Sequence, residues 1–170
     1  MLVYSPVFDP YHCAFRAIRL LRKSPVPELE IERWRILDFY LVFPALIRDF
    51  TFPDEYKHLR KLVPKEDGKY RKVTDPKRIF FRMEPIQTAA VSFLVSHKVI
   101  SNAALVDSRK VRWVEEACPE PLRSMTDDLN DDPILEILVG AFMTIDLYGK
   151  SGLKARSDLF QYRYDVPGSK

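Results

Sequence analysis

The stretch ELEIERWRILDFYLVFPALIRDF, at residues 28–50, decides the fold of this chain. Its apolar residues recur at helical spacing on one side of the predicted helix and continue onto the neighbouring side. The first side carries Ile31, Trp34, Leu37 and Leu41, and the second carries Ile36, Phe39, Tyr40 and Phe43. Pro44 should end or kink this helix, with one more turn over residues 45–50. A helix that is apolar over most of its circumference is buried, so the other elements must pack around it.

Asp38 is a carboxylate inside this apolar run. A buried charge needs a partner because its loss of hydration is costly. We predict Arg16, from the preceding helix, as that partner. A structural ion pair is favoured over a catalytic acid, because no second carboxylate or histidine lies nearby in the sequence.

The preceding helix is predicted over residues 10–23. Asp9-Pro10 fits an N-cap followed by proline at the first helical position. Ala14, Ile18 and Leu21 form its apolar stripe. A second stripe consists of His12, Arg16, Arg19 and Lys23. A solvated face is the favoured interpretation of this stripe; contact with phosphates or an acidic partner is the functional one.

The composition favours a mainly α protein of the α+β class, folded as a compact helical domain. Of its 170 residues, 46% are hydrophobic and 30% are charged, which provides enough apolar material for a core. Only 5 residues are glycine, which disfavours folds built on phosphate-cradling loops. The 13 prolines fall mostly at predicted element boundaries and indicate several short helices.

The same features indicate a cytoplasmic protein. Cys13 and Cys118 lie far apart in the sequence, which is typical of reduced thiols. The first residues lack the pattern of a signal peptide, and no apolar stretch reaches the roughly 18–20 residues of a membrane span. The net charge of +3 is too small to indicate nucleic-acid binding by itself. We expect no membrane contact.

Changes in composition predict a division into two lobes. Residues 1–64 form an N-terminal helical lobe in which Asp54 caps a short helix through Leu62. Residues 65–78 form a basic linker or loop, and residues 79–170 form a second helical lobe; one single domain is the alternative. A solvated loop is the default interpretation of residues 65–78, and contact with nucleic acid is the sharper one. The loop's contact candidates are Lys69, Arg71 and Lys72.

The second lobe resembles a winged-helix unit. Pro85 should open its first helix, and two β-prone runs at residues 103–106 and 111–115 follow. Paired with each other, these runs would make a small winged-helix-like hairpin. Arg109, Lys110 and Arg112 would form the tip and flank of that wing and would contact DNA phosphates.

The last third of the chain should contain two helices and a tail. A short helix is predicted over residues 121–129, and Asp132-Pro133 begins a longer helix that Gly149 stops. The tail, residues 149–165, is aromatic and basic, so it should pack on the body or on a partner. The candidates for protein docking are Tyr11, Leu153, Phe160, Tyr162 and Tyr164, and the tail's candidates for contact with nucleic acid or an acidic partner are Lys154 and Arg156.

The sequence lacks the familiar catalytic and ligand-binding motifs. Gly149-Lys150-Ser151 is not a phosphate-binding loop, because Thr144 stands where the first glycine would have to be. The three histidines are dispersed and neither cysteine has a neighbouring ligand, so we expect no metal site. A nucleophilic GxSxG motif is also missing from the sequence. We therefore expect no cofactor and no enzymatic activity.

Four stretches resemble one protein family. They are YSPVFDPYHCAFRAIRLL (4–21), RILDFYLVFPALI (35–47), MEPIQTAAVSFLVSHKVI (83–100) and GKSGLKARSDLFQYRYD (149–165). Their order and residue patterns resemble those of the middle component of bacterial ABC-three-component conflict systems. This class includes Lamassu-type anti-phage and anti-plasmid defence. The matching positions are Phe8, Asp9, Pro10, Tyr11, His12, Phe15, Arg16, Asp38, Phe39, Tyr40, Pro44, Gly152, Leu153, Lys154 and Arg156.

This resemblance implies a non-catalytic adaptor in a hetero-oligomer. In that family the middle component is thought to sit between an SMC-like ABC ATPase, which senses DNA, and an effector that is often a nuclease. Double-stranded DNA would then be met through the complex. The alternative function is a stand-alone winged-helix DNA-binding protein. A third hypothesis is a small enzyme with a site assembled from His12, Asp38 and Arg16.

Overall fold

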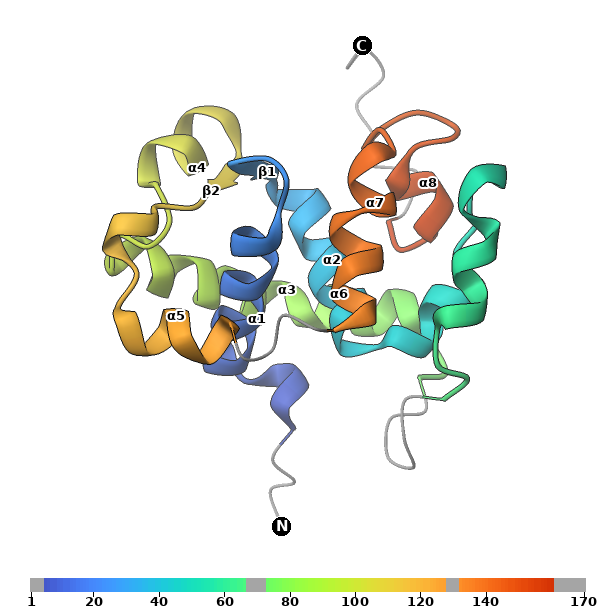
Figure 1. Ribbon diagram of the computed structural model, residues 1–170, viewed down its shortest axis with the longest axis horizontal. Coiled ribbons are helices and arrows are strands. Elements are labelled where there is room, and N and C mark those ends of the chain that lie inside the picture. The colour runs from blue at the N-terminus through green and yellow to red at the C-terminus, as the bar shows by residue number, and fades with distance from the viewer. Residues whose placement is uncertain (1–4, 67–72, 128–131, 161–170) are drawn as a thin grey trace.

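The computed structural model describes residues 5–66, 73–127 and 132–160. The described chain is mainly helical and contains one two-stranded antiparallel sheet, which confirms the predicted fold class (Figure 1). Its buried apolar residues form one connected core that extends from Val7 to Leu159. Among the helices of these ranges, none combines the length and the hydrophobicity needed to cross a bilayer.

Helix α1 (Pro10–Lys23) has the predicted bounds and follows the short 3-10 helix η1 (Pro6–Phe8). Asp9 caps it: its carboxylate accepts hydrogen bonds from the backbone N–H groups of Tyr11 at 2.8 Å and His12 at 3.2 Å. The buried face of α1 includes Ala14, Ile18 and Leu21, as the spacing of its apolar residues predicts.

Helix α2 (Ile31–Val42) lies in the middle of the molecule and packs against α1 and against α6 (Pro133–Val139), which also contact each other (Figure 1). Its side chains Trp34, Ile36, Leu37 and Phe39 are all buried, which confirms the all-round burial expected for this segment. Phe43 leaves the helical conformation because Pro44 follows it. The predicted extra turn is the 3-10 helix η2 (Pro44–Asp49).

Aromatic rings connect α2 to the last third of the chain. Phe50 stacks on Phe142 of helix α7 (Ala141–Thr144), with ring centroids 4.3 Å apart. Tyr40 of α2 meets the same Phe142 edge to face at 5.6 Å. Offset and edge-to-face geometries are the favourable ones for aromatic pairs, so this cluster supplies orientation as well as apolar burial.

Two predicted helix starts in the middle of the chain are wrong. The 3-10 helix η3 (Asp54–Leu62) is preceded by Pro53 in the cap position, and Asp54 instead forms an ion pair with Lys57. Helix α3 (Pro76–Ser96) begins nine residues before Pro85, which lies inside it. Asp75 caps α3, and the burial of residues such as Phe80 on its first turns outweighs the hydrogen bond that an internal proline removes.

The sheet is not the predicted hairpin. Residues 103–106 lie in helix α4 (Asn102–Ser108), which Ser101 caps and Arg109 ends in a left-handed conformation. Strand β2 (Lys110–Arg112) pairs with β1 (Glu28–Glu30) from the first third of the chain. Leu29 lies opposite Val111, and both are buried. The wing is therefore absent, because the first of its two strands is a capped helix.

The last part of the described chain consists of short helices. The 3-10 helix η4 (Glu115–Ala117) and helix α5 (Glu120–Asp127) are followed by α6, α7 and helix α8 (Leu153–Ser157). The helix predicted to run from Pro133 to Gly149 is interrupted at Gly140 and ends at Thr144. A Cβ at Gly140 would lie 2.8 Å from the Glu136 carbonyl oxygen, so a side chain does not fit this close turn.

Gly152, at the start of α8, is a second position where the backbone passes too close to another carbonyl group for a side chain to fit. A Cβ there would lie 2.1 Å from the carbonyl oxygen of Tyr148. We expect Gly152→Ala to lower the free energy of unfolding by about 1–3 kcal/mol, because the backbone must move to relieve the overlap. Urea denaturation measures the change, and the exposed neighbour Ser151→Ala is the matched control. Equal stability of the two variants would contradict the prediction.

Candidate docking surfaces and the buried polar centre

A polar cluster is enclosed between α1, α2 and α3, and we call it the Asp38 cluster: Cys13, Arg16, Asp38 and Gln87. Asp38 has no exposed surface, and its Oδ1 accepts a hydrogen bond from Arg16 Nε at 2.6 Å. Its Oδ2 accepts from Gln87 Nε2 at 2.9 Å and from Arg16 Nη2 at 3.3 Å, and Cys13 Sγ lies 3.6 Å away. The predicted Arg16–Asp38 ion pair is confirmed.

Electrostatics inside the cluster favour a structural role. Burial alone lowers the pKa of Arg16, but the adjacent Asp38 charge and its hydrogen bonds outweigh this effect and raise that pKa above its ordinary value. Burial, followed by the charge of Asp38, raises the pKa of the Cys13 thiol far above its ordinary value. A protonated thiol is a weak nucleophile, and the enclosed Asp38 cannot meet a substrate. We therefore do not retain the enzyme hypothesis built on His12, Asp38 and Arg16.

The basic stripe of α1 joins helices together. Besides the Arg16–Asp38 pair, Arg19 Nη2 lies 3.0 Å from Asp132 Oδ2, and Lys23 Nζ lies 2.9 Å from Glu136 Oε1. These carboxylates neutralise the stripe from within the chain. The functional interpretation of Arg16, Arg19 and Lys23 as a stripe that contacts phosphates is thus corrected, and the favoured interpretation as a solvated face is wrong for Arg16 and Arg19, whose side chains are largely buried.

His12, the fourth member of the stripe, lines an apolar groove between α1, α3 and α5, which we call the Tyr11 groove. Its volume is about 450 Å³. Tyr11 at its edge is 71% exposed and meets Phe93 edge to face, with centroids 5.6 Å apart. Tyr11 and His12 thus remain docking candidates, whereas a role for Phe93, Leu122 and Met125 in this groove was not expected from the sequence.

Of the three cations predicted to form a wing, Arg109 ends α4, and Lys110 and Arg112 are held by one carboxylate. Lys110 Nζ lies 2.8 Å from Glu28 Oε1, and Arg112 Nη2 lies 2.5 Å from Glu28 Oε2. Hydrogen bonds from Lys110 and then Arg112 keep the pKa of Glu28 below its ordinary value. Without a wing or an unpaired charge at Lys110 and Arg112, the winged-helix alternative loses its structural basis. Lys69, Arg71 and Lys72 of the basic loop lie outside the described residues.

Part of the tail that the structure describes packs into the core. Leu153 is fully buried, and the Lys154 side chain is 5% exposed, with its Nζ 4.5 Å from the centroid of the Phe160 ring. Phe160 itself packs against Phe80, and Arg156 donates hydrogen bonds to the carbonyl oxygens of Ser151 and Thr51. The docking role predicted for Leu153 and the surface contact predicted for Lys154 are therefore wrong. Tyr162 and Tyr164 lie outside the described residues.

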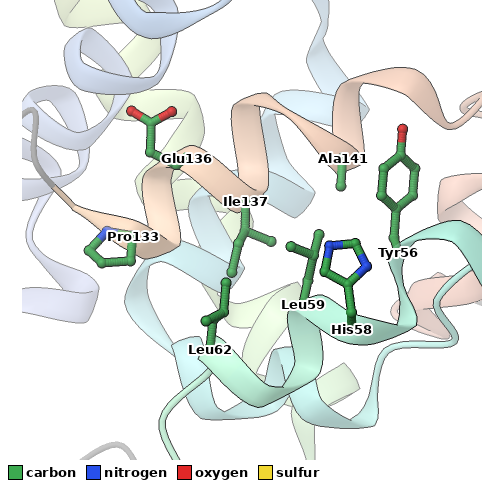
Figure 2. Close-up of a pocket in the computed structure, with 8 residues that line it drawn as sticks. All are labelled: Tyr56, His58, Leu59, Leu62, Pro133, Glu136, Ile137 and Ala141. Carbon is green, nitrogen blue, oxygen red and sulfur yellow. The ribbon is translucent and has the colours of Figure 1, made fainter.

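A second apolar groove lies between η3 and the α6–α7 segment, and we call it the Leu62 groove (Figure 2). Its volume is about 590 Å³, and its lining residues are Tyr56, His58, Leu59, Leu62, Pro133, Glu136, Ile137 and Ala141. Leu62 at the end of η3 is 61% exposed. Sequence reasoning missed this groove, although apolar residues at a spacing of three in an otherwise charged segment were a signal for it.

No metal-binding site is found in the ranges 5–66, 73–127 and 132–160. Within them, no group of three or more histidine, cysteine, aspartate or glutamate side chains is placed to hold one metal ion.

Comparison with known proteins gives one result. Residues 2–165 match the model of the family described as ABC-three component (ABC-3C) system Middle Component 5. No curated protein and no solved structure matches the chain.

We predict that Arg16 and Asp38, the charged members of the Asp38 cluster, are strongly coupled in their contributions to the free energy of unfolding. We expect Arg16→Met to lower the free energy of unfolding by about 3–5 kcal/mol, because Asp38 is left buried without its counter-charge. The double variant Arg16→Met/Asp38→Leu should lose less than the sum of the two single losses, because no uncompensated charge remains. Urea denaturation of the four proteins measures this coupling, and additive losses would contradict it.

Burial and the raised pKa predict that Cys13 is unreactive in the folded protein. During treatment with N-ethylmaleimide at neutral pH, we expect Cys13 to remain unmodified in the native chain and to react fully in urea. Peptide mass spectrometry distinguishes Cys13 from Cys118. Rapid modification of native Cys13 would show that the centre of the core opens to solvent.

Proposed function

Because the chain belongs to the ABC-three component system Middle Component 5 family, we propose that it is a non-catalytic adaptor subunit. It would bridge an SMC-like ABC ATPase and an effector, a nuclease, in a bacterial anti-phage and anti-plasmid complex. Any contact with double-stranded DNA would be made through the complex. The observation that carries this proposal is the family match over residues 2–165, which covers nearly the whole chain.

The arrangement of the surface supports an adaptor. A bridging protein needs two separate docking regions, and the Tyr11 and Leu62 grooves share no lining residue. Helix α5, which walls the first groove, and η3, which walls the second, lie at opposite ends of the long axis (Figure 1). Exposed apolar surface concentrated in grooves is typical of protein-docking sites.

The charges also support a scaffold. The ion pairs of Arg16, Arg19 and Lys23 join α1 to α2 and α6, which makes α1 a rigid wall for the Tyr11 groove. A preformed surface binds more tightly than a flexible one, because less conformational entropy is lost on association. The structure therefore suits a protein that presents fixed surfaces to two partners.

Co-expression with the ATPase and effector from the same operon tests the proposal. We expect the three proteins to elute as one complex in size-exclusion chromatography, with the mass measured by light scattering. The ATPase and effector without this chain should elute separately, and the isolated chain should hydrolyse neither ATP nor DNA. A chain that stays monomeric beside a soluble ATPase and effector would contradict the adaptor function.

A further inference from the structure

The segment η3 has the composition of an α-helix and the geometry of a 3-10 helix. Its nine residues, DEYKHLRKL at 54–62, contain no glycine, no proline and no β-branched side chain, and six of them are good α-helix formers. A 3-10 helix is uncommon beyond three or four residues, because its hydrogen bonds have poorer geometry than those of an α-helix. Contacts outside η3 must therefore hold it in the 3-10 conformation.

Both ends of η3 are fixed to the body of the protein. Phe52, just before it, and Val63, just after it, are both buried. The hydroxyl groups of Tyr56 and Thr144 lie 2.9 Å apart and tie the first turn of η3 to α7. Nine residues span about 18 Å as a 3-10 helix and about 13–14 Å as an α-helix. The distance between the two fixed ends therefore decides which helix this segment forms.

Two arginines hold η3 against the preceding helix η2. Arg48 of η2 donates hydrogen bonds from Nη1 to the carbonyl oxygens of Arg60 at 3.3 Å and of Val63 at 3.1 Å. Arg60 of η3 donates from Nη2 to the carbonyl oxygen of Phe50 at 3.0 Å. Each arginine thus reaches the C-terminal end of the other helix. We call these contacts the Arg48–Arg60 latch.

The latch consists of hydrogen bonds that other groups can replace. Its acceptors are neutral carbonyl groups, and neither guanidinium forms an ion pair within the described chain. Such bonds are weaker than those of an arginine to a carboxylate. Arg60 is exposed and Arg48 is half-buried, so water or a carboxylate can compete for both guanidinium groups.

Opening of the latch would change the shape of the Leu62 groove. Tyr56, Leu59 and Leu62 recur every three residues, so they align on one face of a 3-10 helix, in which three residues complete a turn. In an α-helix each residue advances by about 100°, and Leu62 would be rotated by about 120° from Tyr56. The apolar side chains opposite Ile137 and Ala141 would then no longer form one wall (Figure 2).

We propose that η3 is a two-state element: the Arg48–Arg60 latch holds it as a 3-10 helix, and release of the latch converts it to an α-helix. While the latch is closed, the Leu62 groove keeps its preformed shape. When the latch opens, η3 shortens and Leu62 turns out of line, so the groove is lost. This device lies within the chain and does not depend on the adaptor function proposed above.

Nuclear magnetic resonance of the full chain tests the proposal, because the two helices give different nuclear Overhauser contacts. Contacts from Hα of residue i to the amide proton of residue i+2 mark a 3-10 helix, and contacts to residue i+4 mark an α-helix. We expect the first kind over residues 54–62 in the wild type. In Arg48→Met/Arg60→Met they should be lost and the second kind should replace them. The methyl resonances of Ile137 and Ala141, on the opposite wall, should shift in the same variant.

Arg78→Met/Arg109→Met is the matched control. Both arginines are exposed, and neither side chain forms a hydrogen bond or an ion pair with a described residue, so this variant should keep the wild-type contacts and resonances. Contacts to residue i+4 in the wild type would overturn the proposal. So would persistence of the contacts to residue i+2 in the latch variant, or the loss of both kinds. If the double variant does not fold, Arg48→Met alone gives the same readout, with both kinds of contact expected together.

Discussion

Asp38 is a charged side chain without exposed surface, on a helix that is buried nearly all round, and the arrangement of the other helices depends on it. The carboxylate must be neutralised and hydrogen-bonded where it lies, because leaving it unpaired in the core would cost several kcal/mol. Arg16 of α1 and Gln87 of α3 provide these contacts from two directions. The packing of α1 and α3 on α2 thus has a polar requirement in addition to the apolar one.

This internal use of charge explains what remains on the surface. Arg16, Arg19 and Lys23 form ion pairs with carboxylates of α2, the α6 cap and α6 itself, so the basic stripe holds the fold together. The prominent apolar features of the described surface are the Tyr11 and Leu62 grooves. Apolar grooves on a rigid helical scaffold suit recognition of other proteins, which agrees with the family to which the chain belongs.

Sequence reasoning succeeded where one segment contained all the necessary information and failed where a distant segment decided. Asp9 and the apolar face of α1 lie within one stretch, so its bounds were predicted correctly. Residues 103–106 are too short a run to distinguish strand from helix, and the Ser101 cap selects the helix. Val111 then pairs with Leu29. The two residues are far apart in the sequence, so no local pattern of apolar residues indicates that their strands pair. The burial of Leu153 was missed for the same reason, because it depends on its packing against α2.

By itself the sequence determined some of the local elements and one long-range contact. The caps at Asp9 and Asp132, the all-round burial of α2 and the need of Asp38 for a cation follow from spacing, capping chemistry and the cost of a buried charge. Only the tertiary structure decided the β1–β2 pair, the carboxylate partners of Arg19 and Lys23, and the Leu62 groove. The physical reason is that a groove or an ion pair between distant segments exists only once their helices have packed, and that packing depends on the shape of the whole core.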